Sequence, residues 1–329
     1  MNKRERLEKT LAGEAPDRIP VALWRHWPGD DQRAADLAQA LVDFQKRWDF
    51  DFVKVSPASS YCLLDYGVQD RWAGNIEGTR DYTRRVINRP LDWTELRRLD
   101  PTKGSLGLHQ ETLRLVQQGL EEGTPCLHTI FSPLAQAKNL AGWDQLLLHL
   151  RRDPQRLKTG LNIITENTLR YIEALAGSGI AGIFYAIQHA SYGVMSEAEY
   201  REFGMPYDLR ILNALPPSWW FNMVHLHGEH PFFDLITGYP VQAINWHDRE
   251  TEPDLRQGKA RFGGAVCGGL GRWDVHSGTP AEVRQQAIHA IEQTNGRRLI
   301  LSTGCVMLTT TPQANIRAIR QVVEEQMVL

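Results

Sequence analysis

Short apolar runs alternate with longer amphipathic segments along most of the chain. Apolar runs bounded by turn residues are typical of buried parallel strands, and apolar positions three or four residues apart are typical of helices that cover a sheet. This alternation predicts a (β/α)8 TIM barrel in a single domain spanning residues 1–329. The irregular region 58–125 would be an insertion after the second strand. The strand-like runs lie at 19–27, 50–57, 125–131, 180–187, 220–227, 242–247, 260–269 and 298–305.

The helix-like segments between these runs have recognisable boundaries. Glu199 follows Ser196 at the spacing of a capping box, and Pro280 follows Thr279, which is typical of a first helical turn. A doubly wound open sheet is the alternative architecture, but no run is followed by the glycine-rich turn of a nucleotide-binding strand. Helix-like segments of this kind lie at 33–48, 156–179, 281–296 and 313–326.

Composition and charge narrow the class of protein. Of the 329 residues, 42% are apolar and 23% are charged, as in ordinary globular proteins. The 37 basic and 39 acidic residues leave a net charge of −2, which argues against a nucleic-acid-binding or membrane-surface protein. No apolar stretch resembles a transmembrane span or a signal peptide. We therefore expect a cytoplasmic protein whose four cysteines are reduced thiols.

The fifth run ends in His225-Leu226-His227, and the eighth ends in Cys305. Side chains alternate along a strand, so the two imidazoles share one face. In a barrel, inward side chains at the carboxyl ends of strands approach one another across a narrow lumen. Two imidazoles and one thiolate with an open fourth position are typical of catalytic zinc. A hydrogen-bonded histidine pair and a small buried cysteine are the simpler alternatives, and the residues alone leave both open.

Other polar side chains collect at the same predicted strand ends. His189 and His247 are candidate acid/base groups or further ligands, with satisfied buried histidines as the alternative. Arg25 could bind a substrate carboxylate or phosphate, or form a structural ion pair. The candidates for catalysis are thus His189, His247 and Arg25, and those for substrate binding are Arg25, His26, Gln188 and Asn245.

Several motifs together resemble the uroporphyrinogen decarboxylase superfamily over nearly the whole chain. The resemblance implies a (β/α)8 barrel and one of two activities: decarboxylation in haem synthesis, or corrinoid-dependent methyl transfer to coenzyme M. It also allows a homodimer, because the decarboxylases are often dimers. The motifs are RERLEKTLAGEAPDRIPV (4–21), FDFVKVSPASSY (50–61), SEAEYREFGMPY (196–207), VHLHG (224–228), INWHD (244–248) and GCVMLTTTPQANIRAI (304–319).

The residues that mark the decarboxylases are largely missing. Their N-terminal R-Q-A-G-R run, which grips substrate carboxylates, corresponds to WRHWPGDDQR (24–33), which keeps Arg25 but loses the run. Their Asp after strand two corresponds to VSPASS (55–60), which contains no acid. Four acetate groups on a tetrapyrrole need several cations and an acceptor for the pyrrole NH groups. The comparison therefore disfavours tetrapyrrole decarboxylation.

The methyltransferase branch is more similar at the eighth run. Its G-C, T-T-P-x-A-N-I-K-A pattern matches Gly304-Cys305 and TTPQANIRA (310–318). The Cys of that pattern is a zinc ligand in the family, a role that carries over to Cys305. The family's H-x-C pair matches His225, but His227 stands where the Cys would be. An imidazole in place of a thiolate makes the metal a stronger Lewis acid, so coenzyme M as the acceptor does not follow.

The leading hypothesis is a zinc-dependent, methyltransferase-like enzyme. Zinc on His225, His227 and Cys305 would activate a small-molecule acceptor, with a thiol as the first choice. The methyl donor would be a corrinoid carried on a partner protein. One alternative is a lyase that decarboxylates uroporphyrinogen or a smaller acid, with Arg25 as the clamp. The other is a non-catalytic module that binds a metal, a corrinoid or a tetrapyrrole.

Overall fold

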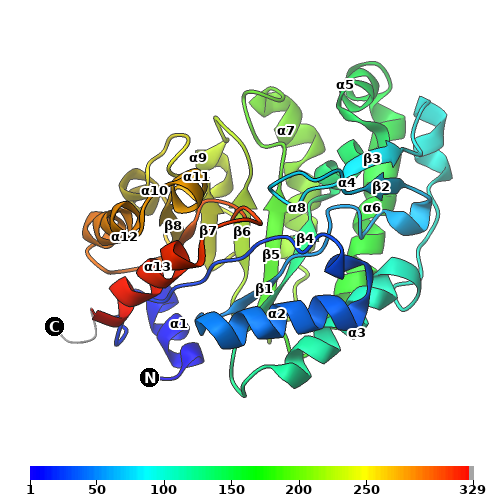
Figure 1. The fold of residues 1–329 in the computed structure, drawn as a ribbon. Coiled ribbons are helices and arrows are strands. Elements are labelled where there is room, and N and C mark those ends of the chain that lie inside the picture. Colours follow the sequence, from blue (N-terminus) through cyan, green and yellow to red (C-terminus); the bar gives the residue numbers. More distant parts are fainter. Residues whose placement is uncertain (326–329) are drawn as a thin grey trace.

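The computed structural model describes residues 1–325 as a curled parallel sheet with helices around it (Figure 1). Seven strands pair in chain order, and every strand residue of this sheet is buried. The expected α/β architecture with a parallel sheet is confirmed. Within the described residues, no helix has the length and apolar character needed to cross a membrane. The strands are β1 (Val53–Val55), β4 (Cys126–Phe131), β5 (Gly182–Ile187), β6 (Met223–Leu226), β7 (Ala243–Trp246), β8 (Ala265–Leu270) and β9 (Leu299–Thr303).

Helices connect consecutive strands and pack against the outside of the sheet (Figure 1). All four helix-like segments expected from the sequence are helical, although residue 326 lies outside the described residues. The capping boxes at Ser196 and Thr279 are both present. The helices are α1 (Lys3–Ala12), α2 (Ala34–Trp48), α3 (Gly104–Gly119), α4 (Pro133–Ala141), α5 (Trp143–Arg152), α6 (Pro154–Leu175), α7 (Glu197–Phe203), α8 (Met205–Leu212), α9 (Phe233–Ile236), α10 (Leu255–Arg261), α11 (Arg272–Ser277), α12 (Pro280–Thr294) and α13 (Gln313–Glu325).

The first expected strand, at 19–27, is not a regular strand. It forms only isolated parallel bridges at the β9 edge, for example between Val21 and Leu301. Pro20 has no N–H to donate to a neighbour, and only its carbonyl takes part, accepting from the Leu301 N–H at 2.8 Å. On its other side, the Val21 carbonyl accepts from the Asp51 N–H, just before β1. The segment therefore touches both edges of the sheet without becoming a full strand.

The region 58–125 was expected to be irregular, and this is wrong in detail. It contains two short 3-10 helices (Leu64–Tyr66 and Pro90–Glu95), the helix α3, and an antiparallel pair apart from the main sheet. The pair consists of β2 (Gln69–Arg71) and β3 (Asp81–Arg84). The segment 72–80 between these two strands supplies part of the lining of the main cavity, described below.

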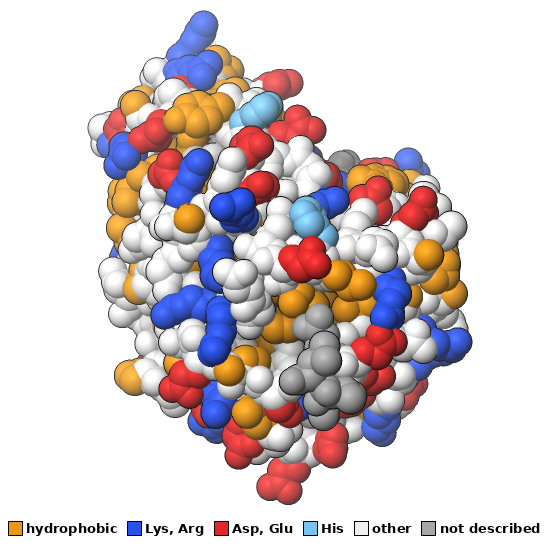
Figure 2. Space-filling view, turned by 90° about the vertical axis from the view of Figure 1, so that its left-hand side faces the viewer, with side chains coloured by type: hydrophobic (Ala, Val, Ile, Leu, Met, Phe, Trp, Pro, Cys, Tyr) orange, Lys and Arg blue, Asp and Glu red, His pale blue; other side chains and the backbone are white. Residues whose placement is uncertain are grey.

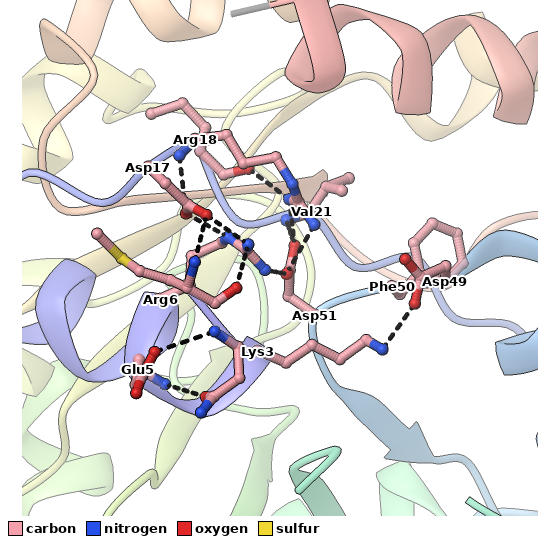
Figure 3. A network of polar contacts seen from close by, with 12 residues as sticks. Lys3, Glu5, Arg6, Asp17, Arg18, Val21, Asp49, Phe50 and Asp51 are labelled. Carbon is pink, nitrogen blue, oxygen red and sulfur yellow. Dashed lines mark hydrogen bonds and ion pairs between the residues drawn. The ribbon is translucent and has the colours of Figure 1, made fainter. Parts of the chain in front are cut away.

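A buried ion network joins the N-terminal residues to the start of the sheet (Figure 3). The carboxylate of Asp51 is fully buried and accepts from the guanidinium groups of Arg6 and Arg18, each at 2.7 Å. It also accepts from the Val21 N–H at 2.7 Å, and Arg6 forms a second ion pair with Asp17. Buried charges are tolerated when they are paired and hydrogen-bonded in this way. The network fixes α1 and the segment 19–27 against the entry to β1.

The molecular surface carries charges of both signs. Figure 2 shows the face at the left of Figure 1, where Lys and Arg side chains gather in one stripe with Asp and Glu on either side. Hydrophobic side chains lie between them. This mixture agrees with the net charge of −2, and the absence of nucleic-acid binding stays a prediction.

Candidate metal centre

Three histidines and one cysteine converge at the carboxyl ends of β6, β7 and β9. His225 Nε2 and His227 Nδ1 each lie 3.7 Å from Cys305 Sγ. His247 Nε2 lies 3.3 Å from His227 Nδ1, and all four donor atoms lie within 4.8 Å of one another. Ligand atoms of a tetrahedral zinc site lie about 3.3–3.6 Å apart, given bonds of about 2.0–2.3 Å. The cluster therefore has the donor types and nearly the spacing that zinc requires.

A close approach of two strand ends brings Cys305 to this cluster. A Cβ on Gly304 would lie 2.5 Å from the Trp246 carbonyl oxygen and 2.8 Å from the Cα of His247. Only glycine therefore allows the end of β9 to pass so close to the end of β7. The Thr303 hydroxyl donates to the Cys305 carbonyl at 2.5 Å, which holds the turn.

Asn245 fixes the orientation of the His225 ring. Its amide nitrogen donates to the carbonyls of Cys267 and Thr303, at 2.8 and 3.1 Å, so its Oδ1 must face His225. That oxygen lies 2.6 Å from His225 Nδ1 and can only accept, so Nδ1 carries the proton. The lone pair on Nε2 then points to the Cys305 side of the cluster. Metal-binding histidines are commonly held through the second ring nitrogen in this way.

His247 is held through its second nitrogen as well. Its Nδ1 lies 3.3 Å from the Glu250 carboxylate, and Glu250 accepts from Arg272 Nε at 3.0 Å. Arg272 also pairs with Glu77 at 2.8 Å. A chain of charges thus runs from the cluster to the segment 72–80. His247, one of the acid/base candidates of the sequence, belongs to the cluster itself.

The charges of the four donors depend on one another. Burial raises the pKa of the Cys305 thiol, but the imidazoles, His225 first, outweigh it and hold that pKa well below its usual range. Burial lowers the pKa of His247, but Cys305 and Glu250 raise it overall to about 9. Without metal, these pKa shifts favour a thiolate at Cys305 beside an imidazolium at His247. A metal cation can take the place of the imidazolium proton.

A cavity of about 130 Å³ lies beside the cluster. His225, His227 and Cys305 line one side of it, and the predicted residues Gln188 and His26 also line it. Asn245, which was also predicted to bind substrate, contacts His225 and does not line the cavity. Other lining residues are the aromatic Trp24, Phe131 and Phe184, the covering residues 77–80, and Lys54.

Lys54 is a lining residue that was missed in the reading of the sequence. It lies in the middle of β1, and its side chain is 6% exposed. A lysine inside the otherwise apolar run FDFVKVSP (50–57) was the available signal, because lysine is rarely buried.

Two of the predicted residues, Arg25 and His189, neither line the cavity nor contribute to the cluster. The guanidinium of Arg25 donates to the Thr309 carbonyl at 2.6 Å and lies 4.1 Å from the centre of the Trp27 ring. The His189 ring stacks on Trp143 with centroids 5.2 Å apart, and burial lowers its pKa well below the usual range. The geometry gives no support to a catalytic role for either residue.

A family model described as uroporphyrinogen decarboxylase (URO-D) matches residues 74–326. The chain belongs to the URO-D family. The match covers most of the chain, and it confirms the family that the sequence motifs resemble.

The relatives that align over nearly the whole chain are methyltransferases. The chain is 20% identical to methylcobamide:CoM methyltransferase MtbA of Methanosarcina acetivorans, with 95% of each chain covered. It is 23% identical to the methylated-thiol–coenzyme M methyltransferase of Methanosarcina mazei, with 90% of this chain and 78% of the relative covered. The fold is similar to that of a methyltransferase from Methanosarcina mazei, with a TM-score of 0.87, 16% identity and 99% of each chain covered. The chain is thus a methyltransferase-like member of the URO-D family.

Proposed function

We propose that this protein is a zinc-dependent methyltransferase that activates a small thiol for attack on the methyl group of a corrinoid carried by a partner protein. The observation that supports this most is the convergence of His225, His227 and Cys305 beside a small cavity. The similarity to a methylcobamide:CoM methyltransferase supports a corrinoid as the methyl donor.

The residues of the site fit the chemistry of such a transfer. Bound zinc would keep the acceptor sulfur as a thiolate at neutral pH. Asn245 keeps the His225 lone pair directed at the cluster, and the imidazoles lower the pKa of Cys305, which favours its thiolate form. In the transfer, a sulfur–carbon bond forms as the carbon–cobalt bond breaks, and both electrons of the broken bond stay on the cobalt.

His247 adds a fourth donor, and a catalytic zinc site keeps one position for its substrate. We assign the exchangeable position to His247. Its second nitrogen is held by Glu250 at 3.3 Å, and the Glu250 side chain is 29% exposed. His225 is instead held at 2.6 Å by a buried amide within the sheet. If the substrate sulfur took that position, His247 would be free to accept the thiol proton on Nε2, since Cys305 and Glu250 favour its charged form.

The decarboxylase alternative finds less support in the cavity. Pockets for drug-sized ligands are about 300–1,000 Å³, so a cavity of about 130 Å³ is too small for a tetrapyrrole. Among the described lining residues, Arg80 is paired with Asp31 and Asp70. Lys54 alone is left to bind a substrate carboxylate, where four acetate groups need several cations.

The metal content of the untagged protein tests the proposal. We expect about one zinc per chain in the parent, and its loss in the His227→Ala and Cys305→Ala variants. The exposed His230→Ala and the buried Cys62→Ala are matched controls that should keep the metal. If the parent binds no zinc even after reconstitution, the proposal is wrong. Metal binding without methyl transfer from any methylated corrinoid would instead favour a non-catalytic binding module.

We also propose that the sheet belongs to a closed eight-membered barrel. The segment 19–27 would fill the eighth position, because Val21 bonds toward β1 and Ala22 bonds to Leu301 of β9. The region 58–125 would then be the insertion that covers the mouth of the barrel.

A further inference from the structure

The segment 72–80 is firmly held at one end and exposed at the other. At its end, Arg80 pairs with Asp31 at 2.6 Å, and these two side chains are only 8% and 1% exposed. The residues before Ile76 are exposed, and a Cβ added to Gly74 would meet no described atom within 4 Å. Residues 77–80, in contrast, line the cavity. Whether the segment covers the cavity therefore depends on the contacts of its middle residues.

These middle residues, 76–78, dock onto the loops that follow β8 and β9. The Ile76 carbonyl accepts from the Thr309 N–H at 2.8 Å and from the Thr309 hydroxyl at 2.9 Å. The Glu77 carboxylate accepts from Arg272 Nη1 at 2.8 Å. A Cβ on Gly78 would lie 2.6 Å from the nearest side-chain atom, so glycine allows this close fit. Because so few contacts hold the docked residues, lifting them costs less than unfolding the whole chain.

Arg272 binds a second carboxylate at the same time, through a different nitrogen. Its Nε donates to Glu250 at 3.0 Å, and the other oxygen of Glu250 lies 3.3 Å from His247 Nδ1. The guanidinium is planar and rigid, so a movement that changes its contact with Glu77 also changes its contact with Glu250. Arg272 is the first residue of α11, where the helix dipole disfavours a cation, so the stability of that helix does not explain an arginine here. The contacts instead link Glu77 to His247.

We propose that Arg272 is a positioning residue that couples closure of the segment 72–80 to the orientation of His247. With the segment closed, Glu77 holds the guanidinium where it supports Glu250, and Glu250 holds the His247 ring. With the segment lifted, Arg272 loses Glu77 and the hold on His247 loosens. A ligand enters while the segment is lifted, and the ring is fixed only when the cavity closes. The use of His247 in catalysis rests on the proposed function, whereas the coupling rests on the contacts of Arg272.

Access to Cys305, which lines the cavity, tests the closure. The protein is stripped of metal with a chelator, shown by circular dichroism to be folded, and treated with two uncharged thiol reagents, the small methyl methanethiosulfonate and the larger 4,4′-dithiodipyridine. Mass spectrometry identifies the modified cysteine. In Glu77→Gln, we expect the larger reagent to modify Cys305 about tenfold faster than in the parent, and the small reagent to gain much less. The exposed Glu229→Gln is the matched control and should behave as the parent. Unchanged rates in Glu77→Gln would overturn the inference.

The motion of the His247 ring tests the coupling, again without metal. In protein labelled with ring-13C histidine, the His247 Cε1–H signal is identified by its loss in His247→Gln, and its NMR relaxation reports how firmly the ring is held. Glu77→Gln should make the ring more mobile, whereas Glu229→Gln should not. In a Glu250→Gln background, Glu77→Gln should have no further effect, because the link to the ring is already broken. A ring equally mobile in parent and Glu77→Gln would overturn the inference. Failure to bind zinc, with both results intact, would overturn only the proposed function.

Discussion

Asn245 Oδ1 lies 2.6 Å from His225 Nδ1, while the amide nitrogen of Asn245 donates to two backbone carbonyls of neighbouring strands. This arrangement leaves one tautomer for His225 and directs its second nitrogen at Cys305. The orientation of a candidate ligand is therefore set by the strand beside it. In Asn245→Ala, we expect metal affinity to fall by about 10- to 100-fold, which competition with a chelator would measure.

Asn245 also links β7 to β8 and β9, so unfolding of the variant would lower its metal affinity as well. The variant must therefore be shown to fold. Circular dichroism and thermal unfolding should show a folded Asn245→Ala protein at the assay temperature. Unchanged metal affinity in a folded variant would show that the Asn245 contact does not position a ligand.

The Cys305 thiol should be ionised at neutral pH in the metal-free protein. The imidazoles of His225, His227 and His247 hold its pKa well below the usual range, in spite of burial. The ultraviolet absorbance of the thiolate should therefore persist at pH 7 and disappear only as the pH falls further. Cys305→Ser should lack this signal, whereas Cys267→Ala should keep it, because burial raises the pKa of the Cys267 thiol. A thiolate signal that appears only near the ordinary pKa of cysteine would contradict the proposed cluster.

Lys54 should make the stability of the protein depend on pH. Its folded pKa of about 7 lies below that of an unfolded lysine, so the unfolded chain binds more protons between about pH 7 and 10.5. Stability contributed by this group therefore rises with pH across that window. Lys54→Met should be more stable than the parent at pH 7, by up to about 4 kcal/mol, and the difference should shrink toward pH 10.

Denaturant unfolding at several pH values would measure this effect. The exposed Lys46→Met is the matched control and should show no such trend. A constant difference between parent and Lys54→Met over the window would mean that Lys54 is solvated or paired in solution.

The ion network at Asp51 should be important for stability (Figure 3). Asp51→Asn leaves the guanidiniums of Arg6 and Arg18 buried without their carboxylate. We expect a loss of about 3–5 kcal/mol in the free energy of unfolding, measured with denaturant. Asp36→Asn, which removes an exposed pair with Arg33, should cost less than about 1 kcal/mol. Equal small losses in both variants would show that the network is not needed for stability.

The sequence by itself determined the elements and the first part of the site. Strand and helix periods are local properties, so the parallel strands, the main helices and the shared face of His225 and His227 could all be predicted. The first strand was the exception. The apolar run 19–27 predicts a strand, but Pro20 within it cannot donate a hydrogen bond to a neighbouring strand. The family motifs added Cys305, which is far away in the chain.

Only the tertiary structure decided which of the remaining polar residues meet. A strand pattern says which face a side chain takes, but not what lies across the sheet. His247 is brought to His227 by the pairing of β6 with β7, and Gly304 lets Cys305 approach them. Arg25 instead turns away to Thr309 and Trp27. Lys54 stands out as a charged residue in an apolar run, but the neighbours that bury it around the cavity come from distant segments. The meeting of these side chains and the burial of Lys54 depend on packing between segments that are distant in the chain. The hydrophobic pattern of a single segment does not contain that information.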